Sequence, residues 1–124
     1  MEAFELLDAD EALLRQIAKL AETIWHEHYE PILGVDQVNY MVEHFQSLRA
    51  MNQIANQGYR YRGVFHQGKL CGYVATAGRP DFLFLSKLYL AAEARGLGLA
   101  SRVLAVLKEE AKAGTGRIQL TVNR

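Results

Sequence analysis

The residues best suited to chemistry form a short run that combines one cation with two glycines, Arg95–Ser101 (RGLGLAS). Glycine lets neighbouring backbone N–H groups converge without a Cβ in the way, and the first turn of a helix offers unpaired N–H donors. Arg95 adds a guanidinium that suits two-point contact with a phosphate. We therefore expect a phosphate or pyrophosphate site here, the alternative being a tight loop whose glycines only turn the chain.

The elements on either side of this run are those that such a site needs. The segments Phe82–Leu85 and Leu88–Leu90 are nearly all apolar or aromatic, which is typical of a buried strand covered on both faces. From Leu99 the apolar residues follow helical spacing, and Gly114 is the expected end of that helix. The sequence therefore predicts a strand, an anion-binding loop and an amphipathic helix.

Two other phosphate loops do not fit the same residues. A P-loop requires Gly-Lys-Ser or Gly-Lys-Thr, and neither tripeptide occurs in the sequence. A dinucleotide-binding loop requires a third small residue in register and an acid after the next strand, but Ile118–Val122 is followed by Asn123 and Arg124.

Arg95, Gly98 and Ala100 resemble the Arg/Gln-x-x-Gly-x-Gly/Ala coenzyme A loop of the GNAT superfamily of N-acetyltransferases. The resemblance implies that acetyl-CoA is the cosubstrate. Lys87–Leu90 also resembles the strand segment beside which the pantetheine arm lies in that superfamily. The residues expected to bind the coenzyme are Leu88, Tyr89, Leu90, Arg95, Gly96, Leu97, Gly98, Leu99, Ala100 and Ser101.

Composition favours one soluble domain over residues 1–124, since 124 residues with 50% hydrophobic side chains can form a single core. The formal net charge is zero, so no overall field favours a nucleic acid or a membrane as partner. The single cysteine, Cys71, is consistent with a reducing compartment. We expect a cytoplasmic protein.

The first half of the chain predicts a strand at Phe4–Leu7 and two helices. Asp8 and Glu11 have the spacing of a capping box, and the first helix is expected to reach about Tyr29, with Pro31 ending it. The second helix is expected to begin with Asp36 as its N-cap. It is expected to run toward Gly58, with a separate turn as an alternative over Met51–Gln57. Its expected apolar face comprises Val38, Met41, Val42, Phe45 and Leu48.

The second half predicts strands at Tyr59–Phe65 and Lys69–Ala77, joined by a hairpin turn, and a last strand at Ile118–Val122. The order of elements is that of the GNAT superfamily up to its fifth strand. This implies an α/β fold with a mixed, largely antiparallel central sheet flanked by helices. Complete members continue further, so we expect a fragment, a natural truncation, or a homodimer in which a partner completes the sheet.

The resemblance implies transfer of acetyl from acetyl-CoA to a primary amine of a small molecule or peptide by direct attack. A backbone N–H near Leu88 or Tyr89 would stabilise the oxyanion. The amine must lose a proton, and a base is expected among residues of the two helices that overhang the acceptor site in this superfamily. We assign catalytic roles to Glu27, Glu30 and Tyr89, with His28, Tyr40 and His44 as further candidates and ordinary solvated or core residues as the alternative.

Two further possibilities concern the same helices. Trp25, Tyr29 and Tyr40 could line an acceptor pocket through cation–π contact, although core packing is the simpler role for Trp25. His26 and Glu30 share a helix face but lack a third ligand, so we expect no metal site. The alternative function is a coenzyme A-binding module without catalysis.

Overall fold

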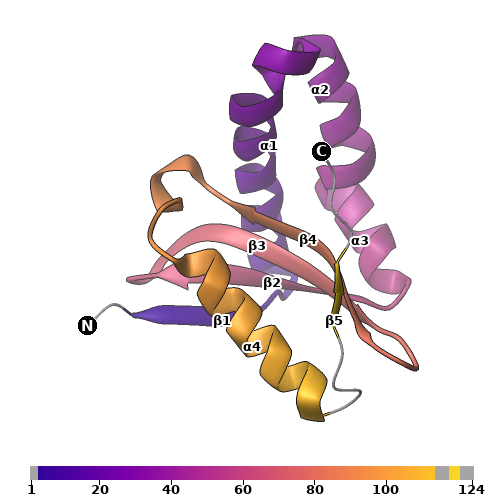
Figure 1. The fold of residues 1–124 in the computed structure, drawn as a ribbon. Coiled ribbons are helices and arrows are strands. Elements are labelled where there is room, and N and C mark those ends of the chain that lie inside the picture. Colours follow the sequence, from indigo (N-terminus) through magenta and orange to yellow (C-terminus); the bar gives the residue numbers. More distant parts are fainter. Residues whose placement is uncertain (1–2, 114–117, 121–124) are drawn as a thin grey trace.

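The fold is a five-stranded sheet with helices on both of its faces, as Figure 1 shows. The structure, a computed structural model, describes residues 3–113 and 118–120. Strands follow the order β1-β2-β3-β4-β5, antiparallel up to β4 and parallel between β4 and β5. This confirms the predicted fold class. The elements are β1 (Phe4–Asp8), α1 (Glu11–Leu33), α2 (Val35–Met41), the π-helical turn η1 (Val42–Gln46), α3 (Leu48–Asn56), β2 (Tyr59–His66), β3 (Lys69–Gly78), β4 (Leu83–Leu90), the short 3₁₀ turn η2 (Ala92–Ala94), α4 (Leu99–Ala113) and β5 (Ile118–Leu120).

Two apolar layers hold the helices to the sheet. On one face, α1 and α3 pack through Ile17 and Met51 against Tyr73 of β3. On the other face, α4 packs through Val103 against Val74, the next residue of β3. Neighbouring residues of a strand point to opposite faces, so β3 supplies both layers. Figure 1 shows α4 alone on its side of the sheet and the other helices opposite.

The first helix begins and ends later than predicted. Asp10 rather than Asp8 is the N-cap, its carboxylate accepting the Leu13 N–H at 2.8 Å, because Asp8 is still in β1 and pairs with Arg60. Pro31 lies inside α1 near its end, where few further helical hydrogen bonds depend on it. Gly34, with φ of 85°, ends the helix. Within the described ranges, no helix is long and apolar enough to cross a membrane.

The predicted second helix is broken in two by the π-helical turn. Gly34, not Asp36, precedes α2, so the predicted N-cap is wrong. Ser47 caps α3 by accepting the Ala50 N–H at 3.2 Å, and Met51–Asn56 continues α3 rather than forming a separate turn. The wider π turn also changes the helical phase, so Phe45, predicted on the apolar face, is 51% exposed.

A buried ion pair joins α4 to the sheet. Arg62 of β2 has a side chain only 3% exposed, and its guanidinium donates to both carboxylate oxygens of Glu110 at 2.6 and 3.0 Å. Glu110 is 35% exposed, so water partly screens the pair. The pair connects the helix that begins beside the glycine run to the sheet.

We expect Glu110→Gln to lower the free energy of unfolding by about 2 kcal/mol. That is less than the roughly 3–5 kcal/mol for a fully buried pair, because Glu110 is partly exposed. Denaturant unfolding measures the change. Glu109→Gln is the matched control, since its contact with Lys112 is exposed and should contribute little. Equal effects of the two substitutions would contradict the importance of the buried pair.

Candidate functional site

An irregularity in β4 shapes the site. Lys87 pairs with Ala75 and Leu85 with Thr76, which leaves Ser86 as an extra residue in a β-bulge. Among the described residues, β5 pairs in parallel with Leu83–Leu85 of β4. After the bulge, the segment Lys87–Leu90 continues to pair with β3.

The prediction that β4 is covered on both faces is wrong. Leu85 is its one buried residue, and the others are half-buried. The reason is that one stretch of the strand lines cavities instead of a packed core. Reduced coverage at this point leaves room for a ligand.

The glycine run after β4 has the backbone expected of an anion-binding loop. Gly96 and Gly98 have φ of 82° and 75°, values that side chains with a Cβ rarely adopt. The space around both Cα atoms is open, and α4 begins directly afterwards at Leu99. The first turn of a 15-residue helix therefore presents its N–H groups beside this loop.

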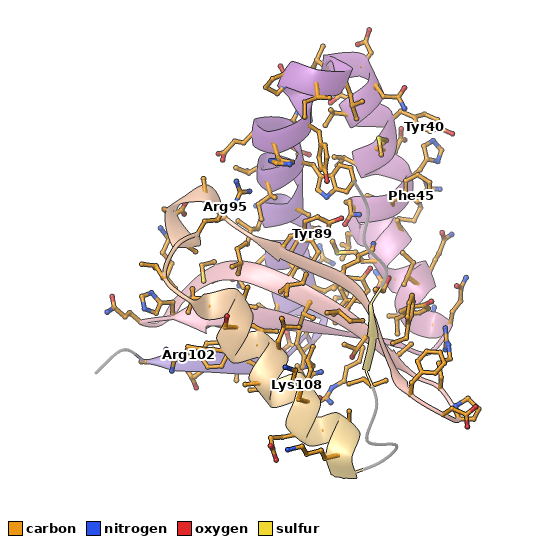
Figure 2. The ribbon with its side chains drawn as sticks, viewed as in Figure 1. Tyr40, Phe45, Tyr89, Arg95, Arg102 and Lys108 are labelled. Carbon is orange, nitrogen blue, oxygen red and sulfur yellow. The ribbon has the colours of Figure 1, made fainter. Side chains whose placement is uncertain are left out.

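Arg95 connects the loop with the end of β4. Its Nε donates to the Leu90 carbonyl at 3.2 Å, and it makes no ion pair within the described residues. Figure 2 shows Arg95 on the loop at the end of β4. A cavity of about 220 Å³ has as its lining Leu88, Tyr89, Leu90 and Arg95 together with Ile24, His28 and Tyr29 of α1. The structure thus brings the predicted strand residues and Arg95 together at one cavity.

The remaining loop residues differ in their exposure to solvent. Leu99 is buried in the α4 core, which leaves only its N–H for a ligand. Leu97 is 42% exposed, and Ser101 is exposed on the first turn of α4. Ala100 is half-buried.

A second cavity, of about 440 Å³, lies between β4 and the helices. Its walls include four aromatic side chains, and Tyr29 and Tyr89 also line the smaller cavity. Trp25 packs against both tyrosines, with ring centroids 4.5 and 5.7 Å away. Figure 2 shows Tyr89 between the sheet and the helices. The full lining is Trp25, Tyr29, Leu33, Met41, Phe45, Gln46, Ile54, Ser86, Lys87 and Tyr89.

Lys87 is a site residue that the sequence reasoning missed. Its ammonium donates to the Phe45 carbonyl at 2.8 Å, to the Tyr61 hydroxyl at 3.2 Å and, at 3.5 Å, to Gln46 Oε1. Burial lowers the pKa of Lys87 to about 8. A single charged residue, Lys87, within the segment Phe82–Leu90 was the available signal.

Gln46 completes this polar cluster. It is 2% exposed, and its Oε1 accepts the Tyr73 hydroxyl at 2.8 Å as well as the weaker contact from Lys87. Burial raises the pKa of Tyr73 well above its usual value, so Tyr73 remains a hydrogen-bond donor. The network fixes the π turn against β3 and β4.

The carboxylates predicted to be catalytic lie elsewhere. Glu27 and Glu30 line a surface depression with His26, and Glu30 Oε2 is 2.9 Å from His26 Nδ1. Of the further candidates, His28 lines the smaller cavity, whereas Tyr40 and His44 contact each other as tilted rings with centroids 4.2 Å apart. Within the described ranges, no group of three potential metal ligands occurs. Of the three residues assigned catalytic roles, only Tyr89 lies at the cavities.

The fold and these features define an α/β domain in which a glycine loop, with the backbone expected of an anion site, joins β4 to α4. The model of the acetyltransferase (GNAT) family matches residues 14–124, and the chain belongs to this family. The predicted family is therefore confirmed. A sequence search of curated proteins gives no match.

Solved structures with the same fold include three acetyltransferases, and the chain is 98% covered in each comparison. PaiA N-acetyltransferase from Thermoplasma acidophilum, in complex with coenzyme A, has a TM-score of 0.81 at 18% identity over 80% of that chain. Ribosomal-protein-alanine N-acetyltransferase from Brucella melitensis has a TM-score of 0.69 at 17% identity over 81% of that chain. An acetyltransferase from Trypanosoma brucei has a TM-score of 0.61 at 17% identity over 84% of that chain.

We expect Lys87 to make stability depend on pH. The folded chain releases the Lys87 proton near pH 8, whereas an unfolded lysine retains it to about pH 10.5, so the unfolded state binds more protons between these values. Stability should therefore rise with pH across this window, by up to about 3 kcal/mol for the full shift. The measurement is denaturant unfolding between about pH 7 and 9.5, below the ordinary tyrosine range. Over this range the free energy of unfolding of wild type should rise relative to that of Lys87→Met.

Lys108→Met is the control, because Lys108 is exposed on α4, as Figure 2 shows. The difference in free energy of unfolding between wild type and Lys108→Met should stay constant with pH. If the difference between wild type and Lys87→Met also stayed constant with pH, that would contradict a buried ammonium at position 87.

Proposed function

We propose that the protein is an N-acetyltransferase that transfers acetyl from acetyl-CoA to a primary amine of a small molecule or peptide by direct attack. The observation that carries the proposal is the junction at Tyr89, where a cavity beside the loop and a larger cavity share two aromatic walls. A coenzyme and an acceptor could approach this junction from opposite sides.

The loop residues fit the coenzyme. The N–H groups from Gly96 to Ser101 would hold the pyrophosphate, because the positive φ of both glycines and the start of α4 orient donors there. Arg95, which has no carboxylate partner among the described residues, would add two-point phosphate contact. The backbone of Leu88–Leu90 would hydrogen-bond the pantetheine amides. Family membership and the coenzyme A complex of the Thermoplasma protein support this placement.

The reaction requires two proton movements. The neutral amine attacks the thioester carbonyl, a C–N bond forms, the oxyanion collapses, and the C–S bond breaks to release a thiolate. A β4 N–H near Leu88 or Tyr89 would stabilise the oxyanion. We assign protonation of the thiolate to the Tyr89 hydroxyl. Glu27 and Glu30 would receive the amine proton through water, because neither lines the two cavities.

Two further proposals concern the setting of the activity. We propose that the protein works in the cytoplasm, which a lone buried Cys71 supports because it needs no oxidising compartment. We also propose that a second copy can pair with an edge of the sheet, where β1 and β5 lie. Light scattering of the purified chain tests this dimer.

We expect acetyl-CoA to bind, and Gly98→Ala to weaken its binding at least tenfold. A Cβ at φ of 75° costs about 1–2 kcal/mol of strain, and relief of that strain would move the loop N–H groups. Calorimetry measures the affinity, and acetyl-CoA at 100 times its dissociation constant should stabilise the fold by about 2.7 kcal/mol.

Gly68→Ala is the matched control, because Gly68 has φ of 78°, open surroundings and a place in the β2–β3 hairpin turn. It should have similar strain and unchanged affinity for acetyl-CoA. Equal affinity of both variants and wild type would show that the glycine loop does not hold the coenzyme.

We expect acetyl transfer to a panel of amines, detected as release of the coenzyme thiol. Tyr89→Phe should lower kcat about a hundredfold, as expected for loss of a proton donor, and should leave acetyl-CoA affinity unchanged. Unchanged kcat would remove Tyr89 from the mechanism. Tight acetyl-CoA binding without transfer to any amine would favour a coenzyme A-binding module.

A further inference from the structure

The larger cavity has an unusual charge balance for a site that takes amines. Of its described lining residues, Lys87 is the one with a charged side chain, and none is an aspartate or glutamate. The walls around it are mainly aromatic or aliphatic. A cationic ligand without a negative group would therefore meet an uncompensated positive charge in partly dehydrated surroundings.

Lys87 is held as a cation by neutral groups. The acceptors of its three N–H groups are a backbone carbonyl, a phenol and, at the longest distance, an amide oxygen. Each carries only a partial negative charge, so the full charge of the ammonium stays unbalanced. Its pKa of about 8 still leaves it mostly protonated at neutral pH, which argues against a role as the general base there.

Trp25 contributes an aromatic wall to the same cavity. It is 5% exposed, and its indole N–H lies close enough to the Tyr73 hydroxyl to affect the pKa of that group. The hydroxyl oxygen can accept from the indole while its own proton is donated to Gln46. Lys87 is therefore the charged donor in this cavity on which recognition of a ligand depends.

We propose that the acceptor is a free amino acid with an apolar side chain, and that Lys87 selects it by binding its carboxylate. The inference rests on the proposed acetyl transfer and names its substrate class. The aromatic walls suit the apolar side chain, while the Lys87 ammonium supplies the charge for the carboxylate, which would replace the long 3.5 Å contact to Gln46. The nearby ammonium would also favour the neutral form of the acceptor amine, which is the nucleophile.

The test compares leucine with 3-methylbutylamine, which differ only in the carboxylate. Trp25 is the single tryptophan of the chain and lines the cavity, so its fluorescence reports binding of either ligand to the full chain in the presence or absence of coenzyme A. The proteins compared are wild type, Lys87→Met, Lys87→Arg and the control Lys108→Met. Loss of a charge-assisted contact typically weakens binding about tenfold to a hundredfold.

We expect wild type and Lys108→Met to bind leucine at least tenfold more tightly than the amine. Lys87→Met should bind both ligands equally, and Lys87→Arg should keep part of the preference. Binding of neither ligand by wild type, a preference for the amine, or an unchanged preference in Lys87→Met would each overturn the proposal. Calorimetry with acetyl-CoA on the same proteins separates these results from a failure of the proposed acetyl transfer, which would appear as absent coenzyme binding.

Discussion

The site depends on one extra residue in β4. Before the bulge at Ser86, Leu83 and Leu85 face α4; after it, Leu88 and Leu90 face α4. Side chains alternate along a strand, so without the bulge the residues of the second half would exchange faces. Lys87 and Tyr89 would then point into the α4 core and two leucines would face the larger cavity. The bulge therefore determines which side chains of β4 face the larger cavity.

A second irregular element, the π turn η1, lies across the larger cavity from the bulge in β4. The Lys87 ammonium bonds to the Phe45 carbonyl within that turn. Gln46 of the same turn bonds to Tyr73 of β3. Helical π turns and β-bulges both disturb regular hydrogen bonding and are frequent at functional sites. Here the polar side chains of Lys87 and Gln46 connect the π turn to the sheet. The position of η1 is therefore coupled to the register of β4.

Regular elements and local turn signals were predictable from the sequence, and irregular ones were not. The stripe from Leu99 predicted α4, and the hairpin glycine Gly68 predicted the β2–β3 turn, because each is set by short-range periodicity or by φ. The bulge at Ser86 and the break at Ser47 depend on the packing of the sheet against the helices, which no local pattern specifies. The position of Lys87 in the cavity depends on the same packing. The local sequence pattern therefore did not predict it.

The charge at Lys87 bears directly on how an amine could be acetylated without a carboxylate beside it. An alkylammonium is protonated at neutral pH and cannot attack a thioester, so some group must favour the neutral form. A carboxylate base does this by taking the proton, whereas a nearby cation does it by repelling the charged form. Repulsion alone would also expel the substrate. A carboxylate on the acceptor resolves this conflict, because it is attracted to Lys87 while the ammonium beside it loses its proton more readily. The lining of the cavity thus links the selection of the acceptor to its activation through the same side chain.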